Sequence, residues 1–259
     1  MASAPLLDRA TPPTLAELRG SAAALTGMLR LEIDPEDREG WISGDDLCNP
    51  EAGPSADLHA RFIAGGFACN RRASAASLLL RYGWAAGWQI AAWLERGVIL
   101  HADRFAVKFS QSTLMEAVWV QEARIEQPES EAQGYRLLLD SLRAFTGPLV
   151  ESQHQWSRFS RHALWSMAVS SWAAQFAVIG ERLGRRDTAM EEARRIFALD
   201  PVIERAAPES YVVSAGSLSR VCQKRAACCL YYKGPAKHFC VSCPIIPREE
   251  RLARNREFT

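Results

Sequence analysis

The sequence predicts an α+β protein with a predominantly helical main domain, a small antiparallel sheet and a short cysteine-rich module at the C-terminal end. Three observations predict this class. Apolar residues recur at helical spacing over much of the chain, residues 97–125 are rich in β-branched and aromatic side chains, and five of the seven cysteines fall within residues 222–243. We therefore expect a mainly helical scaffold or binding domain over residues 1–216 and a cysteine-rich module over residues 217–259.

Composition and charge exclude several classes of protein. The 259 residues include 31 Lys and Arg against 30 Asp and Glu, and 48% are hydrophobic, which excludes a disordered, collagen-like or low-complexity chain. A net charge of +1 argues against a nucleic-acid partner, because duplex-binding domains are usually clearly basic. The N-terminal apolar stretch lacks the basic flank of a signal peptide, so we expect a cytoplasmic protein whose thiols stay reduced.

The first 60 residues predict one helix and one loop. Thr14 and Glu17 form a T-x-x-E capping box, and the apolar residues that follow extend the predicted helix to about Leu29. Residues 34–54 are acidic and rich in turn-forming residues, so we expect a surface loop there.

Two stretches rich in alanine and tryptophan predict buried helices. Residues 74–96 read as one core helix, with a kink expected near Gly83 or Gly87. Residues 163–180 are 18 consecutive residues without a formal charge. At this length a membrane-spanning helix becomes a candidate. Their serines and alanines favour a buried core helix instead, and the tryptophans of the chain are more typical of core than of a ligand-binding wall.

Between these two stretches the residue pattern changes from helical spacing to that of β-strands. Residues 98–100, 105–109 and 115–120 are rich in β-branched and aromatic residues, with a turn expected at residues 102–104. A small antiparallel sheet follows from this pattern.

Helices are expected again over most of the rest of the main domain. Residues 135–145 and 152–183 have helical spacing, and a second capping box at Thr188 and Glu191 predicts a further helix that stops near the Asp200–Pro201 pair.

Four cysteines in a short loop form the pattern that points most directly to chemistry. The pattern is C-C-x10-C-x2-C, and it includes Gly234 and Pro235, which exclude one regular helix. Thiolates bind both zinc and iron–sulfur clusters. Adjacent cysteines direct their side chains apart, which is awkward for a zinc ribbon and easier for a centre with two irons. Structural zinc and a disulfide between the neighbours remain as alternatives.

The residues around these cysteines resemble a known signature. The run from Arg225 through the adjacent cysteines to Tyr232, followed by Cys240 and by Cys243–Pro244, is similar to the C-terminal signature of the FhuF family of ferric-siderophore reductases. The similarity covers residues 225–244, whereas the preceding part agrees only in size and in its tryptophan-rich helical texture. In that family four cysteines hold a [2Fe-2S] cluster. The resemblance therefore implies that the metal and cofactor ligands are Cys228, Cys229, Cys240 and Cys243.

The resemblance also implies an activity, that of a cytosolic oxidoreductase that transfers one electron from a [2Fe-2S] cluster to a ferric siderophore and releases Fe(II). Oxygen chelators hold Fe(III) far better than Fe(II), so no catalytic group beyond the cluster is needed. The chain has no dinucleotide-binding fingerprint, so we expect an external donor such as a ferredoxin or a flavoprotein reductase. Basic residues beside the cysteines would raise the cluster potential or dock the substrate or donor, the candidates being Arg220, Lys224, Arg225, Lys233 and Lys237.

Other interpretations stay open. The chain could be a siderophore- or protein-binding module with a zinc or sensing iron–sulfur site, or an electron carrier for another oxidoreductase. We expect Cys222 to be a small buried hydrophobe, Cys48 and Cys69 to be free thiols, and His238 to be a solvent-facing loop residue. Residues 248–256 read as an exposed helix. The sequence has no lipid-anchor motif, although peripheral association with a membrane is compatible with it.

Overall fold

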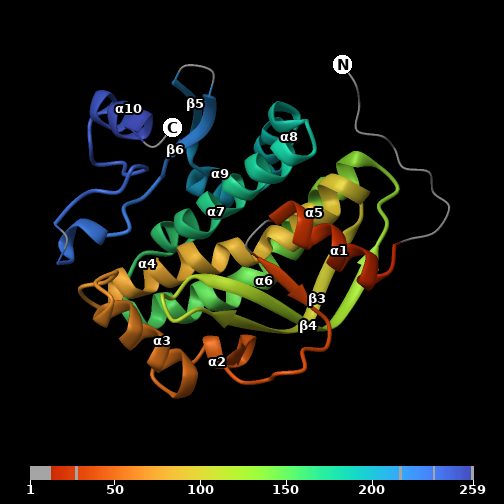
Figure 1. The fold of residues 1–259 in the computed structure, drawn as a ribbon, viewed down its shortest axis with the longest axis horizontal. Helices are drawn as coiled ribbons and strands as arrows, with labels where there is room; N and C mark the ends of the chain where they lie inside the picture. The colour runs from red at the N-terminus through yellow and green to blue at the C-terminus, as the bar shows by residue number, and fades with distance from the viewer. Residues whose placement is uncertain (1–12, 27–28, 216–217, 236, 258–259) are drawn as a thin grey trace. The chain divides into compact units, whose positions relative to one another are not determined.

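The computed structural model describes residues 13–26, 29–215, 218–235 and 237–257. The chain folds into two compact units, each built from separate stretches. The first contains Met1–Gly44, Trp84–Gly147 and Gln175–Leu199, and the second contains Asp45–Gly83, Pro148–Ala174 and Asp200–Thr259. Most of the described elements are helices, and the strands form a four-stranded and a two-stranded sheet (Figure 1). The predicted α+β, mostly helical class is confirmed.

The N-terminal helix α1 (Leu15–Thr26) begins at the predicted capping box. The Thr14 hydroxyl accepts a hydrogen bond from the backbone N–H of Glu17 at 3.3 Å, and the Glu17 carboxylate accepts one from the backbone N–H of Thr14 at 2.7 Å. Each side chain thereby satisfies a donor that the first turn of a helix leaves unpaired.

The sheet of the first unit is mixed, not purely antiparallel as predicted. Its strands are β1 (Arg30–Glu32), β2 (Trp41–Ser43), β3 (Ile99–Phe109) and β4 (Met115–Glu126), in the order β1-β4-β3-β2. β1 pairs parallel to β4, while β2–β3 and β3–β4 are antiparallel. The sequence pattern missed β1 and β2 because each has only three residues and β2 lies within the turn-rich segment.

The expected turn at residues 102–104 is wrong. β3 runs through these residues without a break, and the pairing with β4 shifts register between Ala102 and Arg104. The chain reverses later, where the N–H of Ser110 donates to the carbonyl of Leu114 at 2.9 Å. A polar interruption in a strand can be absorbed as a bulge, so it does not by itself mark a turn.

Buried side chains join the helices of the first unit to its sheet. α5 (Gly87–Arg96) places Gln89 against β3, where its amide donates to the carbonyl of Leu100 at 3.3 Å and to the hydroxyl of Ser141 at 2.9 Å. The Trp88 ring packs edge-on against the Phe145 ring, with centroids 6.0 Å apart.

The second predicted capping box is wrong. Helix α8 (Arg186–Phe197) begins before Thr188, which therefore lies inside the first turn. Glu191 instead forms ion pairs with Arg194 and Arg195. Gly184 adopts a positive φ of 68°, which turns the chain into α8 earlier than the capping pattern suggested.

The helix predicted over residues 74–96 is interrupted where its kink was expected. α4 (Arg71–Tyr82) ends at a short 3₁₀ turn, η1 (Gly83–Ala86), and α5 follows. Gly83 allows the backbone of α7 to come close, since a β-carbon at this position would lie 2.8 Å from the carbonyl oxygen of Ala168.

The two longest helices are α6 (Glu131–Ser157) and α7 (Arg161–Arg182). Within the described residues, α7 is the one helix whose length and composition would suit a membrane span, and 89% of its apolar window is buried inside the protein. The hydroxyl of Ser171 donates to the carbonyl of Leu80 at 2.6 Å, so a polar group of this helix is satisfied within the fold. The predicted buried core helix over residues 163–180 is confirmed.

Three further helices belong wholly or mostly to the second unit. α2 (Gly44–Leu47) and α3 (Gly53–Ala64) begin within the segment expected to be a surface loop, and that expectation is wrong for these residues. α9 (Pro201–Ala206) starts at the predicted Asp200–Pro201 stop, where the Asp200 carboxylate accepts from the backbone N–H of Val202 at 2.7 Å.

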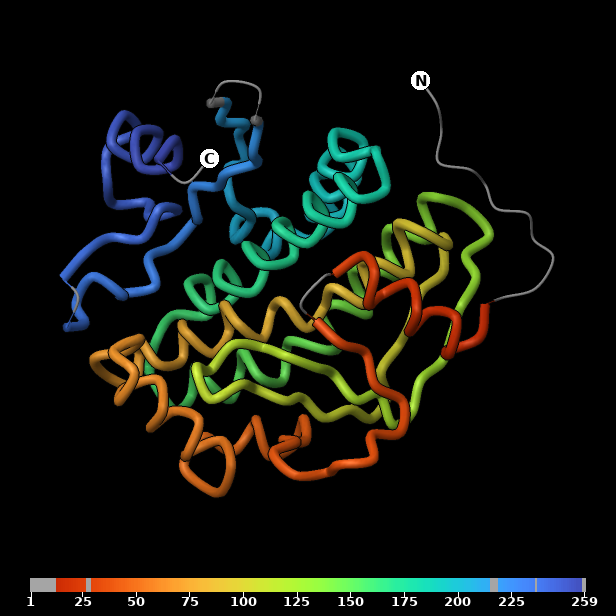
Figure 2. Tube along the Cα trace, in the orientation of Figure 1, coloured from red at the N-terminus to blue at the C-terminus, as the bar shows by residue number. Residues whose placement is uncertain are grey.

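A hairpin leads into the cysteine-rich segment. β5 (Glu209–Ala215) and β6 (Leu218–Lys224) pair antiparallel from end to end, so they connect the two sides of the boundary expected near residue 216. After β6 the chain passes through a loop with one 3₁₀ turn, η2 (Tyr231–Lys233), and returns to α10 (Arg248–Glu257), which packs on β5 (Figure 2).

Candidate metal centre

The four cysteines of the motif lie in the irregular loop between β6 and α10, and all belong to the second unit. Their thiols approach one another in two pairs: Cys228 hydrogen-bonds with Cys243, and Cys229 hydrogen-bonds with Cys240. The charge of Arg225 interacts with all four sulfurs. Residues from both halves of the motif therefore meet around one guanidinium.

Arg225 lies at the base of this loop and faces inward. Its side chain is only 5% exposed. The guanidinium Nη2 donates to the sulfur of Cys240 in a short hydrogen bond and lies 3.5 Å from the sulfur of Cys229. Its backbone N–H donates to the carbonyl of Ser242 at 3.0 Å, which ties the start of the loop to the second cysteine pair. In this position Arg225 contacts sulfur rather than presenting its charge to a docking partner.

The thiols differ in acidity because of these contacts. A hydrogen bond from Cys229 and the charge of Arg225 lower the pKa of Cys240 to about 7, although burial opposes the shift. The same hydrogen bond, together with burial, raises the pKa of Cys229, which keeps its proton. Burial also raises the pKa values of Cys228 and Cys243. Cys240 is therefore the thiol that ionises first.

Backbone N–H groups lie against three of the four sulfurs. The donor and acceptor pairs are Leu230 to Cys228, Tyr231 to Cys229, and Ile245 and Ile246 to Cys243. Leu230 reaches its sulfur, at 3.3 Å, in a left-handed conformation with φ of 62°. Such N–H groups stabilise thiolates, and hydrogen bonds to sulfur tune the potentials of iron–sulfur sites.

The C-terminal helix α10 supports the second pair of cysteines and is not simply an exposed helix as predicted. Arg251 is 4% exposed, and its Nη1 donates to the carbonyls of Cys243 at 3.2 Å and Ile246 at 3.0 Å. Asn255, equally buried, donates to the carbonyl of Val241 at 3.0 Å. Residues 248–256 are mostly charged, which suggested a solvated helix. The sequence pattern cannot show that Arg251 and Asn255 donate hydrogen bonds to carbonyls of the cysteine loop.

Contacts from the helices hold the first half of the loop. The backbone N–H of Ala227 donates to the hydroxyl of Ser166 on α7 at 3.0 Å. The loop also meets the α3–α4 turn, where a β-carbon on Gly234 would lie 3.2 Å from the carbonyl oxygen of Gly66. The motif is thus fixed by segments far from it in sequence.

Of the other four basic candidates, Arg220 is exposed on β6, Lys224 pairs with Glu209 at 3.4 Å, and the remaining two are exposed in the cysteine loop. Lys233 and Lys237 lie in the loop between the two cysteine pairs, and Lys233 Nζ is 5.9 Å from the centre of the Tyr232 ring. His238 is also exposed, as expected, and its ring packs edge-on against that of Tyr231 at 5.2 Å. These side chains give the loop a cationic and aromatic surface.

The remaining cysteines lie outside the two pairs. Cys222 is buried in β6, in agreement with its expected role as a small hydrophobe, and burial raises its pKa. Cys48 is half-buried and Cys69 is exposed, and both are free thiols as expected.

Arg81, in the last turn of α4, is a neighbour of the cysteine loop that no sequence pattern indicated. Its guanidinium carbon lies 5.0 Å from the centre of the Phe62 ring and 4.6 Å from that of the Phe67 ring. Its charge interacts with Cys229 and Tyr231. Its place in the sequence, after an alanine- and leucine-rich stretch of α4, carries no signal of this neighbourhood, because only the fold brings Arg81 to the cysteine loop.

The arrangement of the cysteine thiols can be compared with what zinc and iron–sulfur centres require of their ligands. Within the described ranges, no group of three or more His, Cys, Asp or Glu side chains is gathered closely enough for one metal ion. The thiols instead contact in two pairs. Single zinc ions require four ligands around one point, whereas a [2Fe-2S] cluster takes two thiolates on each of two irons. The paired thiols, the N–H donors and the buried cation fit a two-iron centre better than a zinc ion.

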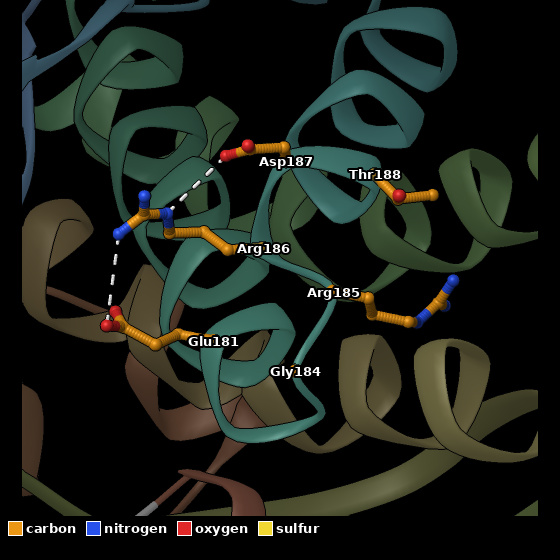
Figure 3. A pocket seen from close by; sticks show the side chains of 6 residues that line it. All are labelled: Glu181, Gly184, Arg185, Arg186, Asp187 and Thr188. Carbon is orange, nitrogen blue, oxygen red and sulfur yellow. Dashed lines mark ion pairs between the residues drawn. The ribbon is translucent and has the colours of Figure 1, made fainter. Parts of the chain in front are cut away.

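A hollow in the first unit is a second feature that could hold a ligand. It lies at the α7–α8 turn and is lined by Glu181, Gly184, Arg185, Arg186, Asp187 and Thr188 (Figure 3). Arg186 forms ion pairs with Glu181 at 3.9 Å and with Asp187 at 3.5 Å, and Arg185 pairs with Glu192 at 2.9 Å. The ion pairs compensate these charges within the protein, so they give the hollow no strong attraction for an ion.

Two comparisons with known proteins found no match. No protein-family model matches the chain, and no curated protein is significantly similar to it. The resemblance of residues 225–244 to the FhuF signature therefore stays a prediction.

Proposed function

We propose that this protein is a ferric-siderophore reductase that holds a [2Fe-2S] cluster with Cys228, Cys229, Cys240 and Cys243. The observation that carries the proposal is the arrangement of these four thiols in two contacting pairs around the buried Arg225. When bound, the cluster would supply electrons one at a time, which suits the reduction of Fe(III) to Fe(II).

The protein's own residues have three tasks in this proposal. The adjacent cysteines and the later pair present the thiolates from opposite ends of the loop. Arg225 offsets part of their negative charge, which favours the more negatively charged, reduced state of the site. The backbone N–H groups at Leu230, Tyr231 and Ile245 hold the sulfurs in place and also favour added negative charge.

Substrate and donor follow from the same chemistry. Siderophore oxygens bind Fe(III) much more strongly than Fe(II), so gaining one electron weakens the chelate and releases iron without an acid or a base. The electron comes from outside, from a ferredoxin or a flavoprotein reductase, because the chain has no dinucleotide-binding fingerprint. The exposed Lys233 and Lys237 would meet an acidic surface of that donor. The proposed compartment is the cytoplasm, where thiols stay reduced.

The proposal is tested on the full chain purified without oxygen. We expect about two irons and two sulfides per chain, an absorption spectrum of a [2Fe-2S] protein, and reoxidation of the dithionite-reduced protein by a ferric siderophore with Fe(II) released to a ferrous chelator. The variant Cys240→Ser should lose the spectrum and the activity. The control Cys69→Ser removes an exposed thiol outside the pairs and should retain both.

Three results would contradict the reductase. Stoichiometric zinc would indicate a structural site and move the function toward a binding module. A cluster that a ferredoxin reduces but no ferric chelate reoxidises would indicate an electron carrier. Full activity in the Cys240→Ser variant would exclude the proposed ligand set.

A further inference from the structure

Arg81 brings a second positive charge, besides that of Arg225, to the cysteine site. It lies in the last turn of α4, is partly exposed, and is held between its contacts with the Phe62 and Phe67 rings. Its charge interacts with Cys229 and Tyr231. In the part of the chain that the structure describes, Arg81 forms no ion pair, its Nε is buried without a hydrogen bond, and its Nη1 reaches only the Ser77 carbonyl at 3.4 Å.

The segments that meet around Arg81 contain no carboxylate. Residues 58–94, which include the α3–α4 turn and all of α4, have no Asp or Glu, and neither do residues 224–247 of the cysteine loop. The two segments touch at Gly66 and Gly234. A partly desolvated cation whose neighbouring segments carry no carboxylate gains from an anionic ligand, because the buried Nε–H donor has no hydrogen-bond partner.

We propose that Arg81 determines substrate specificity by binding an anionic oxygen of the iron chelate beside Cys229, and that it favours chelates with a net negative charge. The inference rests on the proposed reductase function. Three catecholates around Fe(III) leave a negatively charged complex, whereas three hydroxamates leave a neutral one, so Arg81 should distinguish these two classes.

A small chelate suits this position better than an acidic protein. The guanidinium is recessed against two aromatic rings, so a chelate oxygen can reach it, whereas the carboxylates of a protein surface would meet the exposed Lys233 and Lys237 first. Arginine is also suited to this role because its flat group can stack on an aromatic ring and still donate from its edge.

The test measures binding without turnover. Gallium(III) complexes of a tricatecholate and of a trihydroxamate replace the iron complexes, because gallium keeps their size and charge and is not reduced. Titration calorimetry on the full chain with its bound cofactor compares the wild type with Arg81→Gln, Arg81→Lys and the control Arg72→Gln. Arg72 is exposed in the first turn of the same helix, roughly 13 Å along the axis from Arg81 at 1.5 Å per residue.

We expect the wild type to bind the anionic tricatecholate more tightly than the neutral trihydroxamate. Arg81→Gln should weaken tricatecholate binding about tenfold and trihydroxamate binding less than about twofold, as for the loss of one charged hydrogen bond. Arg81→Lys should keep much of the preference, because it keeps the charge. Arg72→Gln should behave as the wild type.

Several outcomes would overturn the inference. They are equal losses for both complexes in Arg81→Gln, the same loss in Arg72→Gln, and a wild type that shows no preference. A variant that slows only reduction by an acidic ferredoxin would assign Arg81 to the donor instead. The reductase function is judged separately: if the wild type reduces both ferric chelates without preference, only this inference fails, and if it reduces neither, the proposed function fails. Cluster content and circular dichroism confirm that each variant is folded.

Discussion

Because Arg225 contacts the cysteine pairs, we expect it to affect the acidity of Cys240, which can be tested in the metal-free protein. We consider the variant Arg225→Gln in the metal-free, reduced protein. Glutamine fills much of the same space but carries no charge. The thiolate of Cys240 would then keep its hydrogen bond from Cys229 and lose the guanidinium that donates to it.

The size of the effect follows from the acidity of Cys240. Its pKa is lowered from 9.0 to about 7, so the folded protein favours the thiolate by about 2.7 kcal/mol at about 1.36 kcal/mol per pKa unit. The hydrogen bond from Cys229 is the largest cause and Arg225 is a further one. We therefore expect the variant to raise the pKa of Cys240 by about one unit, which corresponds to about 1.4 kcal/mol.

The sign of the pH dependence is also fixed. Because folding lowers the pKa of Cys240, the stabilisation is complete above the unfolded value of 9.0 and is lost as the pH falls through about 7. The difference in unfolding free energy between wild type and Arg225→Gln should therefore grow from about pH 6 to about pH 9, where the thiolate is populated in the folded protein.

The assay is the rate of alkylation by iodoacetamide between about pH 6 and about pH 9, with Cys240 identified by mass spectrometry of its peptide. Lys237→Gln is the control, since it removes a cation of the same loop that is exposed. An alkylation profile of Cys240 that is unchanged in Arg225→Gln, or shifted equally in the control, would show that Arg225 does not stabilise the Cys240 thiolate.

Three further predictions concern the support of the site and the helices around it. Arg251→Ala should lower the unfolding free energy by about 2 to 4 kcal/mol and speed loss of bound iron, because two buried carbonyls lose their donor; unchanged urea midpoints and iron retention would contradict this. Gly83→Val should destabilise the protein by about 1 to 3 kcal/mol in urea, because its β-carbon would lie 2.8 Å from the Ala168 carbonyl oxygen. The control Gly20→Ala, inside α1 with open space around it, should not destabilise the protein and should stabilise it by up to about 1 kcal/mol, because alanine favours the helix. Burial lowers the pKa of His59 from 6.5 to about 4, so the protein should lose about 3 kcal/mol of stability as the pH falls from about 6.5 to about 4; His59→Phe should flatten this slope in urea titrations, and an equal slope in both proteins would argue against a buried neutral imidazole.

Much of the helical framework could be predicted from local sequence alone. The capping box at Thr14 and Glu17 forms as expected, because its two hydrogen bonds depend only on residues three apart. The break at Gly83 and the helix stop at Asp200 also follow from the conformational limits of glycine and proline. The buried character of α7 follows from its composition, because an uncharged helix with scattered serines can satisfy them inside a fold.

Local sequence failed where pairing between distant segments decides the structure. The three-residue strands β1 and β2 form because they pair with β4 and β3. A run of three residues is too short to predict such pairing from its sequence. The bulge near Ala102 looked like a turn for the same reason, since the continuous β4 strand holds β3 extended through it.

The site divides in the same way. The spacing of the four thiols, with Gly234 and Pro235 between them, predicts a loop that folds back and brings them together. How the thiols pair and what surrounds them depends on the fold. Arg225 turns inward to the sulfurs, and the distant helices α4 and α10 bring in Arg81 and Arg251. The physical reason is that charge and hydrogen bonding act through space, and a buried cation takes its role from the neighbours that folding gives it.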